Sequence, residues 1–525
     1  MSQIKPENWV PVGVENLESN AWRALRSDTN LSVVAGPGAG KTEFLAQKAT
    51  YLLQTGICPD PFQILAISFK RDAAANLTER VKKRCPPEQA IRFTSITFDA
   101  FTKSLVDRFQ SALPDEWKPS SPYEITFPKA RDFEEALRSS RFNAPVDAWV
   151  QDIVAINRGT FEANLVGCTR LPFERFVPRT GRDFAVSNWW SLNLTNKTPS
   201  ELSFVMLNRL AELLLRFRPD ILSAIRQTYS YVFVDEFQDT TFSQYDFLKT
   251  LFHGSQTKIT TVGDDKQKIM GWAGAVDDAF QQFEYDYGAE RIPLLFNFRS
   301  SPALVQVQHV IANAMDEGIE EVEAQAAMEI DGQAAQIWTF SNKQAEISQI
   351  ATWLSDDMQA RGKSPRDYAV IVRQKADEFE GEIMETFLNN GLKVRNEARM
   401  IGAIGLQDLI GEELVTIFCA MMWVLVKDRQ PKSWKVIENA YLVTQGIDIE
   451  NENSIRKCED RLEAFIKSKK EDIIALNVDA QNANDLCLDI INFFGKDMLS
   501  QAYHQYSMGD LLDLYSESLK LRILC

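Results

Sequence analysis

A glycine-rich segment between a strand pattern and a helix pattern constrains this chain more than any other feature. Residues 31–45 have the sequence LSVVAGPGAGKTEFL, in which a short apolar run is followed by glycines and then by a helix-forming segment. Gly36, Gly38 and Gly40 allow positive φ angles, so backbone N–H groups can close around phosphate oxygens at the start of a helix. The segment therefore predicts a phosphate-binding loop.

The two residues after the last glycine have side chains suited to a nucleoside triphosphate. Lys41 would neutralise the charge of the terminal phosphates, and the hydroxyl of Thr42 would ligate Mg²⁺. The strict form of this motif begins with glycine, whereas this chain has Ala35 at that position. A chance glycine turn with a surface lysine is the alternative, and the strand–loop–helix context argues against it.

A second apolar run ends abruptly in two acids. In YVFVDEFQDT, residues 231–240, Asp235 and Glu236 follow a predicted strand, and ligands bind at the carboxyl edge of parallel sheets. Asp235 would hold Mg²⁺, and Glu236 would orient and deprotonate an attacking water. Taken alone, the pair could equally be a polar turn; the phosphate loop favours a catalytic site.

The order of patterns along the chain predicts an α/β fold. Apolar β-branched runs alternate with helical patterns between residues 17 and 110, which is typical of βαβ units on a parallel sheet. Residues 111–220 are richer in proline and aromatic residues and are predicted to be mainly helical. Beyond about residue 405 the pattern is helical. Further strands are predicted at residues 231–236, 258–265, 292–297, 334–340 and 368–373.

One loop combines two chemistries. The segment GDDKQKIMGWAGA, residues 263–275, has acids, lysines and Gln267 beside Trp272. The polar groups suit phosphate or a metal ion, and the aromatic face suits a nucleic-acid base.

Together these motifs resemble those of UvrD/Rep-like superfamily 1A DNA helicases, over about residues 15–400. That family's phosphate loop also begins with alanine, so the departure at Ala35 becomes a match. The segments that carry the resemblance are AGPGAGKT, ILAISFKRDAAANLTERV, VDEFQDTTFSQYDFL, VGDDKQKIMGWAGA and LLFNFRSSPALV.

The resemblance implies a P-loop NTPase fold with two RecA-like motor domains around an ATP cleft, each interrupted by a helical insertion. We expect the first motor domain at residues 1–110 and 221–285, with its insertion at 111–220. We expect a partial second motor domain at 286–404 and part of its insertion at 405–525.

The resemblance also assigns roles around ATP and Mg²⁺. Gln267 would sense the γ-phosphate, and Arg299 would stabilise charge on the transferring phosphate. Phe298 stands where the family has tyrosine and would pack on adenine. Asn20 stands where the family has a glutamine that contacts the edge of adenine.

The expected partner is single-stranded DNA, or DNA with a single-stranded tail. Trp272 and Phe69 would stack on bases, and Lys70 and Arg71 would lie near the strand. Phe69 could instead be a core residue. The basic run at 80–84 is more typical of a solvated helix face. The pair Trp189 and Trp190 is more typical of packing within the insertion.

Three departures weaken the resemblance. Ala273 replaces an arginine that relatives usually carry, and Asp99 replaces a histidine. The family's last two motifs, including a helix with a second arginine for the γ-phosphate, are absent. We therefore expect the chain as given to be part of a longer protein, a truncated gene product or one half of an assembly. On its own it should bind ATP·Mg²⁺, hydrolyse it slowly and leave duplex DNA wound.

Composition excludes several other classes. The net charge of −16 disfavours a protein coated with nucleic acid. The seven cysteines show no C-x-x-C spacing, which favours reduced thiols in the cytoplasm over a zinc site or a disulfide framework. No apolar run is long enough for a membrane span, so no membrane partner is expected.

The predicted activity is a DNA-dependent ATPase and 3′-to-5′ helicase or translocase, in DNA repair or in phage defence of the Gabija kind. The alternative is a nucleotide-gated DNA-binding subunit that regulates a nuclease partner and does little unwinding itself.

Overall fold

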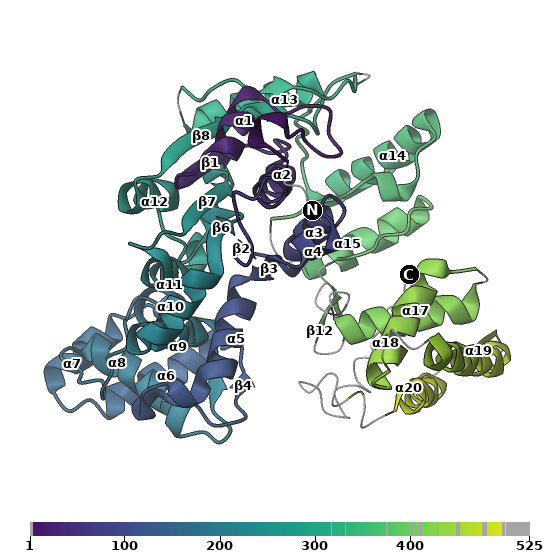
Figure 1. Cartoon of the computed structure of the whole chain (residues 1–525). Helices are drawn as coiled ribbons and strands as arrows, with labels where there is room; N and C mark the ends of the chain where they lie inside the picture. Colours follow the sequence, from purple (N-terminus) through teal and green to yellow (C-terminus); the bar gives the residue numbers. More distant parts are fainter. Residues whose placement is uncertain are drawn as a thin grey trace. The chain divides into compact units, whose positions relative to one another are not determined.

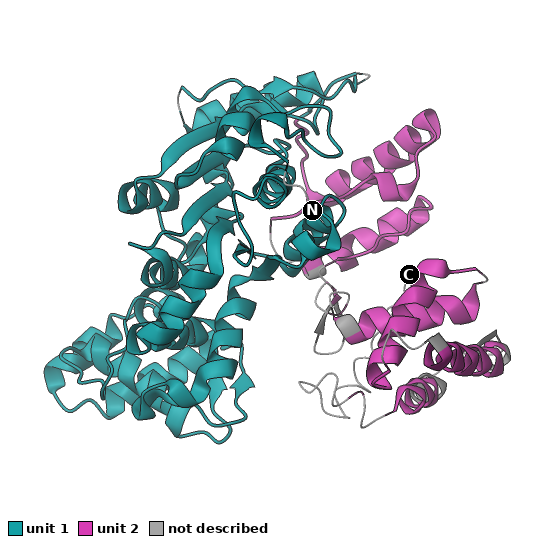
Figure 2. Cartoon of the chain, in the orientation of Figure 1, with its two compact units in different colours: residues 1–336 teal, residues 337–525 magenta. Residues whose placement is uncertain are grey.

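The structure, a computed structural model, divides into two compact units (Figure 2), which are described separately. The first unit is Met1–Gln336 and the second is Ile337–Cys525. The structure describes residues 4–495 and Leu499, apart from 317, 331, 374–375, 398, 402–403, 407–408, 410–411, 428, 448–451 and 475–479.

A six-stranded parallel sheet forms the centre of the first unit (Figure 1), which confirms the predicted α/β class. The strand order is β3-β2-β6-β7-β1-β8, so the chain crosses over the sheet several times. Each strand is a short run of apolar and β-branched residues, as expected for strands covered on both faces. The strands are β1 (Leu31–Ala35), β2 (Gln63–Ser68), β3 (Phe93–Thr97), β6 (Tyr229–Val234), β7 (Lys258–Gly263) and β8 (Glu290–Leu294).

Alternate residues of each strand enter different cores, because successive side chains point to opposite faces of a sheet. On β2, Ile64 and Ala66 join one apolar cluster, and Leu65 and Ile67 join the other. The first cluster includes residues of α1 (Ser19–Arg26), α2 (Lys41–Gln54) and α3 (Arg71–Lys82). The second includes residues of α5 (Phe98–Phe109), α9 (Phe204–Phe217), α10 (Pro219–Thr228), α11 (Phe242–Phe252) and α12 (Ala279–Tyr287).

The segment predicted as a helical insertion consists mainly of helices. A short parallel pair, β4 (Glu124–Ile125) with β5 (Glu201–Leu202), accompanies them. Trp189 and Trp190 are buried among other aromatic rings, which confirms that they are packing residues. The helices are α6 (Ala130–Phe142), α7 (Asp147–Val154), α8 (Gly181–Trp190), a π-helix η4 (Glu162–Val166) and α9.

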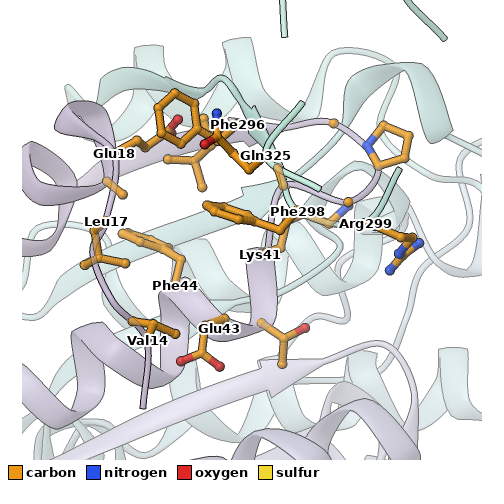
Figure 3. A pocket seen from close by; sticks show the side chains of 18 of the residues that line it. Val14, Leu17, Glu18, Lys41, Glu43, Phe44, Phe296, Phe298, Arg299 and Gln325 are labelled. Carbon is orange, nitrogen blue, oxygen red and sulfur yellow. The ribbon is translucent and has the colours of Figure 1, made fainter. Parts of the chain in front are cut away.

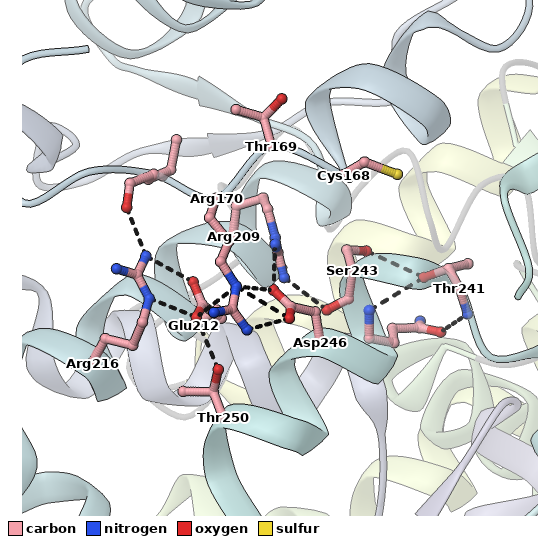
Figure 4. Close-up of polar contacts among 12 residues, drawn as sticks. Cys168, Thr169, Arg170, Arg209, Glu212, Arg216, Thr241, Ser243, Asp246 and Thr250 are labelled. Carbon is pink, nitrogen blue, oxygen red and sulfur yellow. Dashed lines mark hydrogen bonds and ion pairs between the residues drawn. The ribbon is translucent and has the colours of Figure 1, made fainter. Parts of the chain in front are cut away.

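Ion pairs join α9 of this segment to α11, which packs beside the central sheet (Figure 4). Arg209 of α9 is fully buried and donates to Asp246 of α11 at 2.9 Å and to the carbonyl oxygen of Ser243 at 3.0 Å. Arg170 also pairs with Asp246. Glu212, one turn after Arg209, accepts from Arg216 at 2.6 Å. Because a buried charge without its partner is costly, this network anchors α9 against α11.

The sheet continues beyond the predicted domain boundary at residue 286. Strand β8 pairs with β1, with Leu31 opposite Glu290, so it completes the first sheet instead of opening a second domain. The first unit then continues through β9 (Phe296–Asn297), α13 (Pro302–Met315) and β10 (Glu323–Ala324), and β10 pairs with β9 in parallel. The division lies at Gln336.

The second unit is helical in its described residues, apart from the short pair β11 (Met400–Ile401) and β12 (Ile404–Gly405). The strands predicted at 334–340 and 368–373 do not form. Ile337 and Ile371 are 98% and 90% exposed, so these runs lack the neighbouring strand that would bury them. The helices are α14 (Lys343–Arg361), α15 (Ala376–Asn389), α17 (Glu413–Val426), α18 (Pro431–Thr444), α19 (Glu452–Ile474) and α20 (Ala480–Phe494).

The helical pattern predicted after residue 405 is confirmed where the structure describes it, and residues 500–525 lie outside the described part. Among the described residues, none of the helices combines the length and apolar content that crossing a bilayer needs.

Candidate active site

A cavity of about 810 Å³ lies at the carboxyl edge of the sheet in the first unit (Figure 3). In this view Arg299 lies at one end of the cavity, and Leu17 and Glu18 lie at the other. The cavity brings together most of the residues predicted to contact nucleotide. Those that line it are Gly36, Gly38, Gly40, Lys41, Thr42, Glu236, Gln267, Phe298 and Arg299.

The phosphate loop has the geometry that its glycines predict. Gly38 and Gly40 have φ angles of 80° and 76°, which side-chain-bearing residues rarely adopt. A Cβ at Gly38 would lie 2.4 Å from Oδ1 of Asn297. A Cβ at Gly36 would meet nothing within 4 Å. The loop is therefore packed on one side and open on the other, as a phosphate cradle requires.

Asn297 holds the second half of the cavity against the phosphate loop, a role that the sequence reasoning missed. Its Nδ2 donates to the carbonyl oxygen of Pro37 at 2.8 Å, and its Oδ1 accepts from the backbone N–H of Arg299 at 2.9 Å. The N–H of Phe298 donates to the carbonyl oxygen of Gly38 at 2.9 Å. Phe298 and Arg299 are thus placed by the loop itself. The signal was available, because Asn297 opens the quoted N-F-R-S motif.

Glu236 stands at the end of β6 in a strained backbone conformation. Its φ is 50° and its ψ is 46°, the left-handed region that non-glycine residues seldom occupy. Such strain often marks functional sites. Its Oε2 lies 3.4 Å from Nζ of Lys41. The predicted base and the predicted phosphate-binding lysine therefore share one side of the cavity.

Asp235 is buried directly behind Glu236. Burial, and then the neighbouring Glu236 carboxylate, raise the pKa of Asp235 to about 6. A cation beside the Asp235 carboxylate would stabilise its ionised form. Thr42 lines the cavity, whereas Asp235 lies outside its lining. Oxygen ligands of this kind suit Mg²⁺. The metal role of Asp235 and Thr42 stays a prediction.

Gln267 is connected to the end of the neighbouring strand. Its Nε2 donates to Oδ2 of Asp264 at 2.8 Å, and the Asp264 side chain is buried at the end of β7. Its side chain lines the cavity. The predicted γ-phosphate sensor therefore has a fixed anchor.

The residues predicted to contact DNA lie outside the cavity. Phe69 is half-buried directly after β2, and Lys70 and Arg71 are exposed at the start of α3. Trp272 is 72% exposed in a short 3₁₀-helix, Gly271–Ala273. Burial raises the pKa of nearby Asp99 to about 6, and the charge of Arg71 opposes this rise. The exposed aromatic and basic groups leave the predicted DNA contacts open to solvent.

Asn20 does not line the cavity. Its amide donates to the carbonyl oxygen of Pro293 at 2.9 Å, so it ties α1 to β8. The next residue, Ala21, lines the cavity instead and has no polar side-chain atom. An amide contact from Asn20 to adenine is therefore not supported, because a helix turns successive side chains about 100° apart.

Several cavity residues were not predicted. Glu18 accepts from the N–H of Leu295 at 3.0 Å, and burial raises the pKa of Glu18. Arg80 belongs to the basic run that was interpreted as a solvated face, yet it lines the cavity and pairs with Glu43 at 2.5 Å. Arg84 pairs with the same glutamate at 2.8 Å. The sequence pattern carries no signal for these contacts, because their partners lie far apart along the chain.

Comparisons with known proteins place the sequence among DNA helicases. The sequence model of the UvrD/REP helicase N-terminal domain matches residues 17–288. DNA helicase II of Escherichia coli (strain K12) is 27% identical over 375 residues, covering 66% of this chain and 47% of that protein. ATP-dependent DNA helicase PcrA of Leuconostoc citreum is 24% identical, covering 69% of this chain and 47% of that protein.

The "Probable DNA helicase" of Mycoplasma pneumoniae is 24% identical over 387 residues, covering 71% of this chain and 70% of that protein. The matched part of this chain thus spans about half the length of the first two relatives and more of the third.

Proposed function

Because this chain belongs to the UvrD/REP helicase family, we propose that it couples ATP hydrolysis to 3′-to-5′ movement on single-stranded DNA. DNA with a single-stranded tail would serve equally as substrate. The nucleotide cofactor would be ATP with Mg²⁺.

One observation carries this proposal. Gln267 lines the same cavity as Lys41 and Glu236, and the exposed Trp272 lies five residues after Gln267 on the same loop. A motor needs its nucleotide site and its DNA contact on connected structural elements. Stacking on an exposed tryptophan tolerates any base, which suits movement along a strand.

The residues of the cavity divide the chemistry. Backbone N–H groups of the phosphate loop and Nζ of Lys41 would hold the β- and γ-phosphates, and Mg²⁺ at Thr42 and Asp235 would neutralise their charge. Glu236 would orient the attacking water and accept its proton. Arg299, beside the phosphate loop, would stabilise charge that develops on the transferring group.

A second candidate function is a nucleotide-gated DNA-binding subunit of a nuclease-containing defence complex. The observation that favours it is the exposure of the apolar runs at 334–340 and 368–373, because a second motor sheet would bury them. In this alternative the same cavity would gate DNA binding without driving movement. Either function would operate in the cytoplasm, in DNA repair or in phage defence.

ATP hydrolysis by the full chain, with and without single-stranded DNA, separates the two candidates. A DNA-stimulated rate in wild type that Lys41→Ala abolishes supports the motor. DNA binding that responds to nucleotide without any hydrolysis supports the gated subunit. A chain that binds neither nucleotide nor DNA would reject both candidate functions.

A further inference from the structure

The residues that follow the catalytic acids have no role in the function proposed so far. The sequence after Glu236 is F-Q-D-T, and the side chains of Gln238 and Asp239 are only 3% and 6% exposed. Polar side chains are rarely buried so deeply unless they are satisfied by specific partners. Their partners lie in the loop that carries Gln267 and Trp272.

Gln238 bridges the predicted base and the end of the neighbouring strand. Its Nε2 donates to Oε2 of Glu236 at 2.8 Å, and its Oε1 accepts from the backbone N–H of Asp264 at 3.1 Å. Asp264 in turn accepts from Gln267 at 2.8 Å. One amide therefore joins the water-activating residue to the residue predicted to sense the γ-phosphate.

The packing around Gln238 shows that this position is closely fitted. A Cβ at Gly263 would lie 2.1 Å from Oε1 of Gln238 and 3.0 Å from the backbone nitrogen of Phe237. The backbone of β7 can approach the amide only because residue 263 is glycine. Gln238 therefore has little room to adopt another position while this strand stays in place.

Asp239 holds the aromatic loop. Its Oδ1 accepts from the backbone N–H groups of Ile269 and Met270 at 3.1 and 3.2 Å. A carboxylate that accepts two backbone donors makes stronger hydrogen bonds than a neutral acceptor would. Trp272 lies two residues after Met270. The loop that carries Trp272 is therefore attached to Asp239, which lies three residues after Glu236.

The backbone adds further attachments between the same two segments. The N–H of Val276 donates to the carbonyl oxygen of Thr240 at 3.0 Å, and the N–H of Phe242 donates to that of Gly274 at 3.0 Å. Residues 269–276 are thus attached at several points to residues 239–242, while the Trp272 side chain stays exposed.

We propose that Gln238 and Asp239 are positioning residues that transmit the state of the nucleotide site to the DNA-stacking loop. The oxygen of Glu236 that accepts from Gln238 is also the one nearest to Nζ of Lys41. A γ-phosphate that binds Lys41 changes the surroundings of that oxygen. Gln238 passes the change to Asp264 and Gln267, and Asp239 passes movement of the same turn to the Trp272 loop.

This inference rests on the proposed function, because it needs DNA to bind at Trp272. A purely structural role for the two residues would make a different prediction. It would weaken DNA binding or stability by the same factor in every nucleotide state. The coupling role predicts that the difference between nucleotide states is lost.

The test measures the dissociation constant of the full chain for fluorescently labelled oligo-dT. It is measured with ADP·Mg²⁺ and with a non-hydrolysable ATP analogue and Mg²⁺. The ratio of the two constants is the coupling factor, expected to lie at about 5–150 in wild type, the usual range for coupled sites. Binding of a fluorescent ATP analogue serves as the control for folding and for the nucleotide site.

Asp239→Ala should bring the coupling factor close to one while the fluorescent ATP analogue binds as in wild type. Asp239→Asn keeps a neutral acceptor, so it should give an intermediate factor even where the alanine variant folds poorly. Gln238→Met, of similar shape but without hydrogen bonds, should lower the factor as well. Asp277→Asn is the matched control, because Asp277 is an exposed acid just after the same loop and pairs with Lys268 at 3.1 Å.

The outcomes separate the two proposals. Variants of Gln238 and Asp239 that keep the wild-type factor overturn the coupling role and leave the proposed function intact. An equal weakening in both nucleotide states also overturns it, in favour of a structural role. A wild-type protein that binds oligo-dT equally in both states, without DNA-stimulated hydrolysis, overturns the proposed function and the relay together.

Discussion

Two regions of the first unit are built in opposite ways: the region proposed to hold nucleotide, called the nucleotide side, and the region proposed to contact DNA, called the DNA side. On the nucleotide side, Asp235 is buried, Glu236 is held in a left-handed conformation, and Asn297 clamps the phosphate loop. On the DNA side, Trp272 and Lys70 are exposed. The first region is fixed before any ligand arrives, whereas the second presents open groups.

The difference matches what the two ligands demand. Catalysis depends on charges and donors that are already oriented toward the reacting phosphate. A moving strand needs contacts that form and break without sequence preference. The hydrogen bonds from Gln238 and Asp239 join the two regions, so the comparison can be tested by disturbing each side separately.

The largest expected effect is on the nucleotide side. Glu236→Gln keeps the shape of the side chain but removes the group that accepts a proton from water. The turnover number for ATP hydrolysis should fall by about 10²–10⁴-fold, the usual contribution of a general base. Steady-state hydrolysis measures this, and binding of a fluorescent ATP analogue should remain within a few-fold of wild type.

Glu15→Gln is the matched control for this variant, because Glu15 is an exposed acid at the edge of the same cavity. It should hydrolyse ATP at the wild-type rate. Equal losses in both variants would mean that overall charge, and not the position of Glu236, governs the reaction.

A smaller effect is expected on the DNA side. Trp272→Ala removes a stacking surface worth about 1–3 kcal/mol per base. The dissociation constant for oligo-dT should therefore rise about 5–150-fold, as 1.4 kcal/mol corresponds to a factor of ten. Fluorescence anisotropy measures this change, and hydrolysis in the absence of DNA should not change.

The exposed Tyr285 of α12 provides the control for Trp272, because it is an aromatic residue away from the loop. Tyr285→Ala should bind oligo-dT as wild type does. If Trp272→Ala also keeps full affinity for oligo-dT, the loop that carries Trp272 is not the DNA contact.

The smallest effect concerns Asp99, which lies close enough to Arg71 on the DNA side to interact with its charge. Burial raises its pKa to about 6 in the folded protein, so folding favours its protonated form. Its contribution to the free energy of unfolding is fully present below the unfolded-state pKa and is lost as the pH rises through about 6. Asp99→Asn lacks this dependence. We expect it to be more stable than wild type by up to about 3 kcal/mol at pH 7.5, and by less at pH 5.

Chemical unfolding of both proteins at the two pH values measures this difference. A stability difference that is the same at pH 5 and pH 7.5 would show that the Asp99 carboxyl does not titrate in this range. In that case the burial of the Asp99 carboxyl would carry no electrostatic cost.

Local patterns predicted the first unit well. The phosphate loop and the acids after β6 were placed correctly at the edge of a parallel sheet, because each lies directly between a strand and a turn. Their roles in catalysis stay predictions. The motif at residues 297–300 marks Asn297 as a candidate, but its contact with the phosphate loop, about 260 residues away along the chain, is seen only in the structure.

Prediction failed where long-range partners decide the structure. Strand β8 was assigned to a second domain, although its pairing partner is β1. The runs at 334–340 and 368–373 have strand-forming residues, but a strand needs a neighbour to satisfy its backbone groups. Asn20 was assigned to adenine from its distance along the chain to Lys41. In the structure its amide donates to the carbonyl oxygen of Pro293, and the next residue, Ala21, lines the cavity.

The most direct test of the account is the rate of ATP hydrolysis by the full chain, measured with and without oligo-dT. We expect a slow rate in wild type that oligo-dT raises, and a smaller rise with oligo-dT in Trp272→Ala. No hydrolysis is expected from Lys41→Ala under either condition. A wild-type rate that does not change with DNA, in a protein that still binds oligo-dT, would contradict the claim that the two sides are coupled through hydrolysis.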